Sequence, residues 1–248
     1  MDIHKLFDDK SELYAQARPR YPASLYQWLK SVCLNHDAVW DVGCGNGQAA
    51  IDLSRYFRRV EATDISAAQI ANSPNCERVR FSIQPAEYTN FAESSFDAVC
   101  VAQALHWFDY ERFWPEVLRV LKKNGVFAAW GYRWPQIDSS IDEALEQSFL
   151  SVIRPYWASQ NKLLWDGYKD VPFPLAPLEV PSIELTMNWS VSQFFAYLHT
   201  WSATRRCMEA RGWGFFNESF QKVSALWGAE GERTVAMDFV VIAGRKMA

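Results

Sequence analysis

A glycine-rich stretch near the start of the chain constrains its fold more than any other feature. The segment VWDVGCGNGQ places Asp41 at the end of a short apolar run, followed by Gly43, Gly45 and Gly47 at alternate positions. Glycine adopts positive φ and lets the backbone approach a ligand that a Cβ would exclude. Apolar residues at helical spacing follow over residues 48–57. We therefore expect a strand, a tight turn and a helix whose N-terminus can face a negatively charged group.

Strand-like and helix-like runs alternate through the first half of the chain. A helix is expected over residues 112–121, with Pro115 in its first turn, where proline is tolerated. Alternation of this kind implies right-handed crossovers between parallel strands. It predicts an α/β fold with a doubly wound, seven-stranded, mostly parallel sheet. The predicted strands are residues 38–42, 60–63, 79–83, 96–102, 125–132, 182–189 and 234–246.

The pattern changes after Tyr132, where helices become dominant. We expect helices at 139–153 (with Ser140 as the cap), 191–210 and 217–227, while four prolines in 170–181 exclude regular structure there. Eight of the twelve tryptophans lie between Trp130 and Trp227, which suits an aromatic-lined pocket as well as a core. We expect one domain, residues 1–248. Its core is approximately 30–132, 182–189 and 234–246, and a helical, aromatic-rich lid comprises approximately 1–29, 133–181 and 190–230.

Composition excludes several classes of protein. The chain has 25 Lys and Arg against 29 Asp and Glu, a net charge of −4, so it lacks the basic footprint of a nucleic-acid binder. Its five cysteines are scattered and form no C-x-x-C pair, which argues against disulfides and a zinc site. The start of the chain is polar and no apolar run is long enough to span a bilayer. We expect a cytoplasmic protein without a metal or membrane partner, and its oligomeric state stays open.

An acidic residue follows the glycine turn at a meaningful distance. Asp64 ends the second predicted strand 21 residues after Gly43, where an acid that binds ribose hydroxyls is expected. The glycines are spaced G-x-G-x-G, and Gln48 stands where the dinucleotide fingerprint has its third glycine. This spacing counts against a nicotinamide-dependent oxidoreductase, which is kept as an alternative.

With these residues in place, the chain resembles the class I S-adenosylmethionine-dependent methyltransferases over approximately residues 7–132. The resemblance implies a Rossmann-like fold, S-adenosyl-L-methionine as cofactor, S-adenosyl-L-homocysteine as product, and no metal. It also implies roles for single residues. Asp41 would organise the loop and the cofactor's amino end, Gly43 and Gly45 would leave room for the methionine portion, and Asp64 would hold the ribose.

Two further segments extend this resemblance. FSIQPAEYTNF is similar to the family's adenine-contacting segment, with Pro85 at the position that is usually acidic. The Ala86 N–H and Glu87 are then the groups left to contact the adenine. FDAVCVAQALHWFD is similar to the motif whose strand end lies beside the methionine portion.

Arg18 follows Tyr14 by one helical turn, and its guanidinium could bind the cofactor's carboxylate. The predicted cofactor-binding residues are Arg18, Asp41, Gly43, Cys44, Gly45, Asp64, Ile65, Ala86, Glu87, Ala102 and Gln103.

Within the class, residues 14–25, 103–109 and 197–206 resemble the trans-aconitate methyltransferase branch. We therefore expect transfer of a methyl group to a small-molecule acceptor, with a carboxylate oxygen favoured; a non-catalytic S-adenosylmethionine-binding regulator is the alternative. His106 is the candidate catalytic residue. It could act as a base, but a carboxylate is already ionised at pH 7, so we expect it to orient the acceptor. The candidate substrate-binding residues are Trp107, Trp130, Tyr132 and Arg205.

Overall fold

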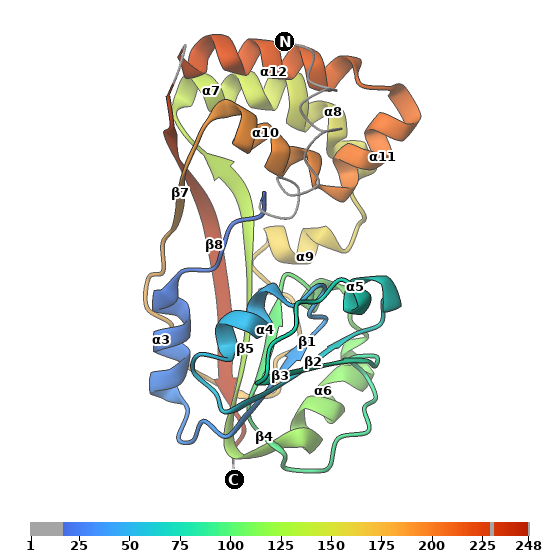
Figure 1. Ribbon diagram of the computed structural model, residues 1–248, viewed down its shortest axis with the longest axis vertical. Coiled ribbons are helices and arrows are strands. Elements are labelled where there is room, and N and C mark those ends of the chain that lie inside the picture. The colour runs from blue at the N-terminus through green and yellow to red at the C-terminus, as the bar shows by residue number, and fades with distance from the viewer. Residues whose placement is uncertain (1–16, 229–230, 248) are drawn as a thin grey trace. The chain divides into compact units, whose positions relative to one another are not determined.

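The computed structural model describes residues 17–228 and 231–247, which form an α/β structure (Figure 1). The strands of the described part are β1 (Ala38–Val42), β2 (Arg59–Asp64), β3 (Val79–Ile83), β4 (Phe96–Ala102), β5 (Leu121–Gln136), β6 (Ala176–Pro177), β7 (Leu185–Trp189) and β8 (Arg233–Arg245). The helices of eight or more residues are α3 (Ala23–Val32), α6 (Tyr110–Val120), α10 (Val191–His199), α11 (Ser202–Arg211) and α12 (Gly214–Trp227). The shorter ones are α4 (Gln48–Leu53), α5 (Ala67–Ala71), η1 (Leu105–Trp107), α7 (Ser139–Leu145), η2 (Glu146–Leu150), α8 (Ser151–Ile153), η3 (Arg154–Tyr156) and α9 (Asn161–Trp165).

The strands form one mostly parallel sheet in the order β3-β2-β1-β4-β5-β8-β6, with β7 pairing with β8. β1 is parallel to β2 and β4, β2 to β3, and β4 to β5, whereas β8 is antiparallel to β6 and β7. The predicted fold class is confirmed. The chain order reverses between β1 and β4, and in open α/β sheets ligands bind beyond the carboxyl ends of the strands at such a point.

The chain divides into two compact units. Among the described residues, the sheet unit comprises 21–133, 162–183 and 239–247. The helical unit comprises 17–20, 134–161, 184–228 and 231–238. Residues 21–29 and 162–181, which we assigned to a lid, therefore belong with the parallel strands, whereas β7 belongs to the helical unit. The single domain with a lid stays a prediction.

The sheet unit buries apolar side chains on both faces of its strands. Successive strand residues point to opposite faces. Trp40 and Val99 share one apolar cluster with Phe113 and Val117 of α6. From α3, Tyr26 packs edge-to-face on Trp130 of β5, with ring centroids 6.1 Å apart. Covering both faces in this way explains why β1 and β4 consist almost entirely of buried residues.

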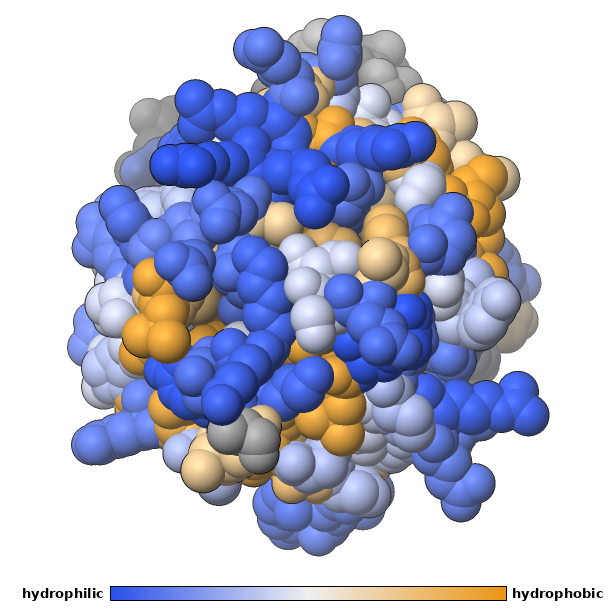
Figure 2. Space-filling model, turned by 90° about the horizontal axis from the view of Figure 1, so that it is seen from below, coloured by the Kyte–Doolittle hydropathy of each residue, from blue (hydrophilic) through white to orange (hydrophobic). Residues whose placement is uncertain are grey.

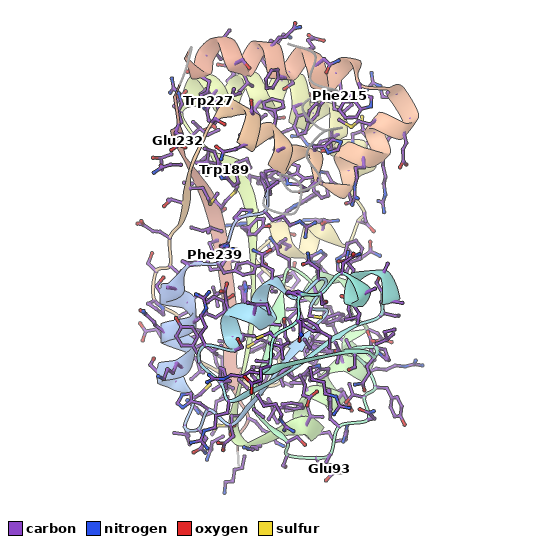
Figure 3. The ribbon with its side chains drawn as sticks, viewed as in Figure 1. Glu93, Trp189, Phe215, Trp227, Glu232 and Phe239 are labelled. Atoms are coloured by element: carbon purple, nitrogen blue, oxygen red, sulfur yellow. The ribbon has the colours of Figure 1, made fainter. Side chains whose placement is uncertain are left out.

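In the helical unit, α7, α10 and α12 lie side by side (Figure 1). Aromatic side chains fill the space between helices: Phe195 and Phe216 meet edge-to-face at 5.3 Å, and Phe194 stacks on Trp227 at 5.4 Å. Trp189 and Trp227, labelled in Figure 3, belong to this unit. Of the eight tryptophans from Trp130 onward, three are buried (Trp130, Trp201 and Trp227), and the other five are partly exposed.

Three local expectations were wrong for reasons visible at helix ends. The Asp109 side chain accepts a hydrogen bond from the Glu111 N–H, so α6 begins at Tyr110 and Pro115 falls in its second turn. Asp138 caps α7, and Ser140 lies inside that helix. The helix expected over 191–210 is interrupted between α10 and α11.

The expectation that the prolines exclude regular structure over 170–181 was also wrong. Ala176 and Pro177 form the short edge strand β6, which pairs antiparallel with β8. Proline is tolerated in an edge strand, where the missing N–H need not bond a neighbour.

The face shown in Figure 2 is mostly hydrophilic, with apolar residues in small separate groups. Scattered apolar residues are normal on protein surfaces. In the described part of the chain, no helix combines the length and the apolar character needed to cross a bilayer.

Candidate cofactor and acceptor site

The glycine turn after β1 has the backbone conformation that the sequence predicts. Gly43, Gly45 and Gly47 have φ values of 65°, 57° and 90°. Residues with a side chain rarely adopt such positive values. A Cβ on Gly43 would lie 2.8 Å from the Ala104 Cβ, and one on Gly47 would lie 2.5 Å from the Phe81 ring. At Gly45 the nearest atom would be 3.9 Å away. The outer glycines thus serve close packing, whereas Gly45 borders open space that a ligand can enter.

Asp64 joins the end of β2 to this turn. Its Oδ2 accepts a hydrogen bond from the Gly45 N–H, and its Oδ1 accepts one from the Ser66 N–H, both at 2.8 Å. An ionised carboxylate offers about four lone-pair positions, so it can accept further hydrogen bonds. Asp64 therefore stabilises the turn and keeps acceptor capacity for hydroxyl groups.

Asp41 lies on β1 just before the turn and is completely buried. Burial raises the pKa of its carboxyl from 3.8 to about 8, an effect that the Ala50 N–H offsets only in part. Neither carboxylate oxygen has a hydrogen-bond partner of normal geometry. An unpaired buried carboxylate is costly, so Asp41 holds a proton at pH 7 until a cation is near.

The loop after β4 is held against β5 through Gln103. This residue has φ 58°, an unusual value for a side-chain-bearing residue. Its N–H donates to the Trp130 carbonyl at 2.8 Å, and its Nε2 donates to the Tyr132 carbonyl at 3.3 Å. A Cβ on Gly131 would lie 2.8 Å from Gln103 Oε1. Gly131 thus makes room for the amide, and this glycine is a sequence signal that we did not use.

His106 lies in η1, two residues beyond Ala104, and is only 5% exposed. Its Nδ1 is 3.2 Å from the Tyr168 hydroxyl. Burial lowers the pKa of His106 from 6.5 to about 4, so the imidazole is neutral at pH 7. The neighbouring Trp107 is 50% exposed, with its ring centroid 4.9 Å from that of His106. Trp107 can therefore offer its ring to a bound molecule.

Tyr168 was not identified from the sequence. It follows α9 in a turn in which Gly167 and Tyr168 have φ values of 71° and 58°. The turn is held by a hydrogen bond from the Tyr168 N–H to the Leu163 carbonyl at 2.8 Å. A Cβ on Gly131 would lie 2.6 Å from Leu164 Cδ1, so this segment packs on β5. Gly167 signals a turn, but only the tertiary fold shows that Tyr168 meets His106.

The other residues predicted to bind the cofactor lie around the same edge of the sheet unit. Cys44 is buried, and its N–H donates to the Thr63 carbonyl at 2.9 Å. Ile65, directly after Asp64, is 78% exposed, and Ala86 is buried after β3. Glu87 Oε1 accepts a hydrogen bond from the Asp109 N–H at 3.1 Å. Ala102 is the last residue of β4.

The remaining candidates are placed differently. Trp130 is completely buried, with Tyr21 and Tyr26 against its ring, so the structure gives it a packing role. Tyr132 is 9% exposed. Arg18 and Arg205 are exposed residues of the helical unit, and Tyr14 lies outside the described residues. The functions of these four candidates stay predictions.

Across residues 17–228 and 231–247, no group of three or more His, Cys, Asp or Glu side chains is arranged to hold a metal ion.

Comparison with known proteins agrees with this geometry. Residues 40–129 match a family model described as a methyltransferase domain. A Dictyostelium discoideum protein named as a methyltransferase is 32% identical over 204 residues, covering 79% of this chain and 78% of that protein. A Saccharomyces cerevisiae protein named as an S-adenosylmethionine-dependent methyltransferase is 34% identical over 143 residues, covering 54% of this chain and 48% of that relative.

A solved structure from Anaeromyxobacter dehalogenans, titled as a type II methyltransferase, matches with a TM-score of 0.86. The identity is 35%, and the match covers 93% of this chain and 98% of the other. The sheet of this chain therefore has the Rossmann-like fold of a methyltransferase, with the glycine turn and Asp64 at its carboxyl edge. The chain belongs to the S-adenosylmethionine-dependent methyltransferases, which excludes the nicotinamide alternative. Its cofactor is S-adenosyl-L-methionine.

Proposed function

We propose that the protein methylates a carboxylate oxygen of a small organic acid, with trans-aconitate as the first acceptor to test. The observation that carries this proposal is the burial of His106, which lowers its pKa to about 4. A phenol, with a pKa near 10, must lose its proton during methylation, and a base of such low pKa removes it poorly. A carboxylate is already ionised at pH 7 and needs no base.

The residues of the site fit the cofactor. Asp41 is a buried carboxyl without a partner, which suits the cationic amino end. Gly45 borders open space for the methionine portion, and Asp64 keeps acceptor capacity for the ribose hydroxyls. We assign Cys44, Ala102 and Gln103 to the methionine side, Ile65, Ala86 and Glu87 to the adenosine side, and Arg18 to the cofactor's carboxylate.

When bound, S-adenosylmethionine supplies a methyl group activated by its sulfonium charge. The protein then has to orient the acceptor in line with that group and to exclude water. The buried, neutral imidazole of His106 suits orientation, and the half-exposed ring of Trp107 suits an apolar contact with the acceptor. We assign Tyr132 and Arg205 to acceptor binding, whereas the completely buried Trp130 keeps its packing role.

The composition supports a small acceptor in the cytoplasm. The net charge of −4 disfavours a nucleic acid as substrate. All five cysteines are free, and four of them are buried. Free thiols are typical of reducing compartments, so we place the reaction in the cytoplasm.

The acceptor class is tested by mass spectrometry with matched compounds. Purified protein and S-adenosylmethionine are incubated separately with trans-aconitate, benzoate, phenol and aniline, and each product is analysed for the gain of one methyl group. We expect gain only on carboxylates, in a product that mild alkali hydrolyses as an ester. Methylation of phenol or aniline without any carboxylate product would overturn the proposal. Gly45→Val protein is the control that should not bind cofactor.

A further inference from the structure

The contact between His106 and Tyr168 has consequences beyond the burial of the histidine. His106 is 5% and Tyr168 3% exposed, and their rings stack with an interplanar angle of 24°. The Tyr168 hydroxyl lies 3.2 Å from His106 Nδ1, and it makes no other hydrogen bond within the described part of the chain. The hydrogen bond between the two rings therefore couples their protonation, and Tyr110 acts on Tyr168 only through its partial charge and not through a hydrogen bond.

The proton of this hydrogen bond can be assigned. Burial raises the pKa of the Tyr168 phenol above its ordinary value, so the hydroxyl keeps its proton. A buried O–H needs an acceptor, and the facing atom is Nδ1 of a neutral imidazole. A neutral imidazole has one acceptor and one donor nitrogen. The phenol therefore donates to Nδ1, and the proton of the ring is on Nε2.

We propose that Tyr168 is a positioning residue that fixes His106 in the Nε2–H tautomer, so that His106 presents a hydrogen-bond donor to the acceptor's oxygen. The proposal rests on the function proposed above and deepens it. For His106 to take a proton at Nε2, the ring proton would have to lie on Nδ1, and the Tyr168 hydroxyl would lose its acceptor. The pair thus selects acceptors that arrive ionised over acceptors that must be deprotonated.

The backbone supports a dedicated position for Tyr168. Positive φ is uncommon for a residue with a side chain, and Tyr168 adopts it directly after Gly167. The Tyr168 N–H is bonded to the Leu163 carbonyl, and the Val171 N–H is bonded to the Tyr168 carbonyl. Both backbone groups of Tyr168 are therefore held, and the hydroxyl is held at His106.

The experiment measures the tautomer of His106 directly, by long-range ¹H–¹⁵N NMR of protein labelled with ¹⁵N-histidine at pH 7. The chain has four histidines, and His106→Gln assigns the signal. We expect wild-type His106 to show an unprotonated Nδ1 and a protonated Nε2, and Tyr168→Phe to show averaged shifts from both tautomers. A wild-type spectrum with the proton on Nδ1, or unchanged shifts in Tyr168→Phe, would overturn the proposal. The wild-type spectrum decides alone if the variant does not fold.

Tyr110→Phe is the matched control, because Tyr110 donates its hydroxyl proton to the Leu105 carbonyl at 3.1 Å and does not bond His106. It should leave the His106 shifts unchanged. With trans-aconitate as acceptor, Tyr168→Phe should lower kcat/KM about five- to tenfold, and Tyr110→Phe less than about twofold. The tautomer is measured without turnover. A wrong tautomer in an enzyme that methylates carboxylates therefore overturns this inference alone. Methylation of phenol with the tautomer as expected overturns the proposed acceptor alone.

Discussion

At the scale of single residues, the burial of Asp41 changes its protonation at pH 7, and cofactor binding can reverse that change. With a pKa of about 8, its carboxyl is mainly protonated at pH 7. The cofactor's cationic amino group favours the ionised form, so binding should lower this pKa and release a proton. We expect S-adenosylhomocysteine binding at pH 7 to release about one proton, measured by calorimetry in buffers of different ionisation enthalpy. In Asp41→Asn the release should vanish. A binding enthalpy that is the same in all buffers for the wild type contradicts the assignment.

His106 is expected to tolerate a substitution that a general base would not. His106→Gln should retain most of the maximal rate with trans-aconitate, because the glutamine amide can still donate a hydrogen bond. The wild-type rate should show no imidazole limb between pH 5.5 and 7.5, since the pKa of His106 is about 4. Rate profiles of both proteins over this range measure the effect. A loss of about a hundredfold together with loss of a pH limb would identify a base.

Asp64 holds the glycine turn and is expected to bind the ribose, and one substitution tests both roles together. Asp64→Ala removes the acceptor for the Gly45 and Ser66 N–H groups and the expected ribose contact. We expect it to weaken S-adenosylhomocysteine binding by about 1–3 kcal/mol by calorimetry. Ser66→Ala keeps the backbone N–H and the carboxylate, so its affinity should match the wild type. An unchanged dissociation constant in folded Asp64→Ala protein would refute the assignment.

At the scale of elements, the glycine turn is tested by a pair of substitutions at two glycines that both have positive φ. Gly45 has φ 57° beside open space, and Gly212 has φ 74° at the end of α11 with nothing within 4 Å of a built Cβ. Valine is strained at either position. Gly45→Val should lose S-adenosylhomocysteine binding by at least about a hundredfold, because its side chain also fills the ligand's space. Gly212→Val should bind normally. Equal affinities in calorimetry would show that the space at Gly45 is not the cofactor's.

The accuracy of the sequence predictions follows from how local each signal is. The strands at 38–42, 79–83 and 96–102 were predicted with correct bounds. A short apolar run between turn residues is a signal contained in the local sequence alone. The start of α6 was wrong, since it depends on whether the Asp109 side chain turns back to bond the Glu111 N–H. Such capping is a contact between residues close in sequence, but more than one nearby side chain can serve as the cap, so the sequence alone does not fix the helix start.

The cofactor side of the candidate site was predicted better than the acceptor side for the same reason. Asp41, the glycines and Asp64 have a characteristic spacing, and parallel strands bring their carboxyl ends to one edge. Tyr168 reaches His106 across 62 residues through a turn after α9. No spacing in the sequence encodes that contact. Gly131 was a usable signal, because a glycine inside a predicted strand often marks a close approach.

At the scale of the whole molecule, β5 and β8 decide how the two units unfold. Each of these strands contributes residues to both the sheet unit and the helical unit. Neither unit therefore has its complete strands without the other, and we expect a single cooperative thermal transition. Saturation with S-adenosylhomocysteine at about 100 times its dissociation constant should stabilise the fold by about 2.7 kcal/mol. For a chain of this size, that corresponds to a rise in Tm of about 5–10 °C. Calorimetry should show one peak that moves as a whole, whereas two peaks of which only one moves would mean that the units unfold independently.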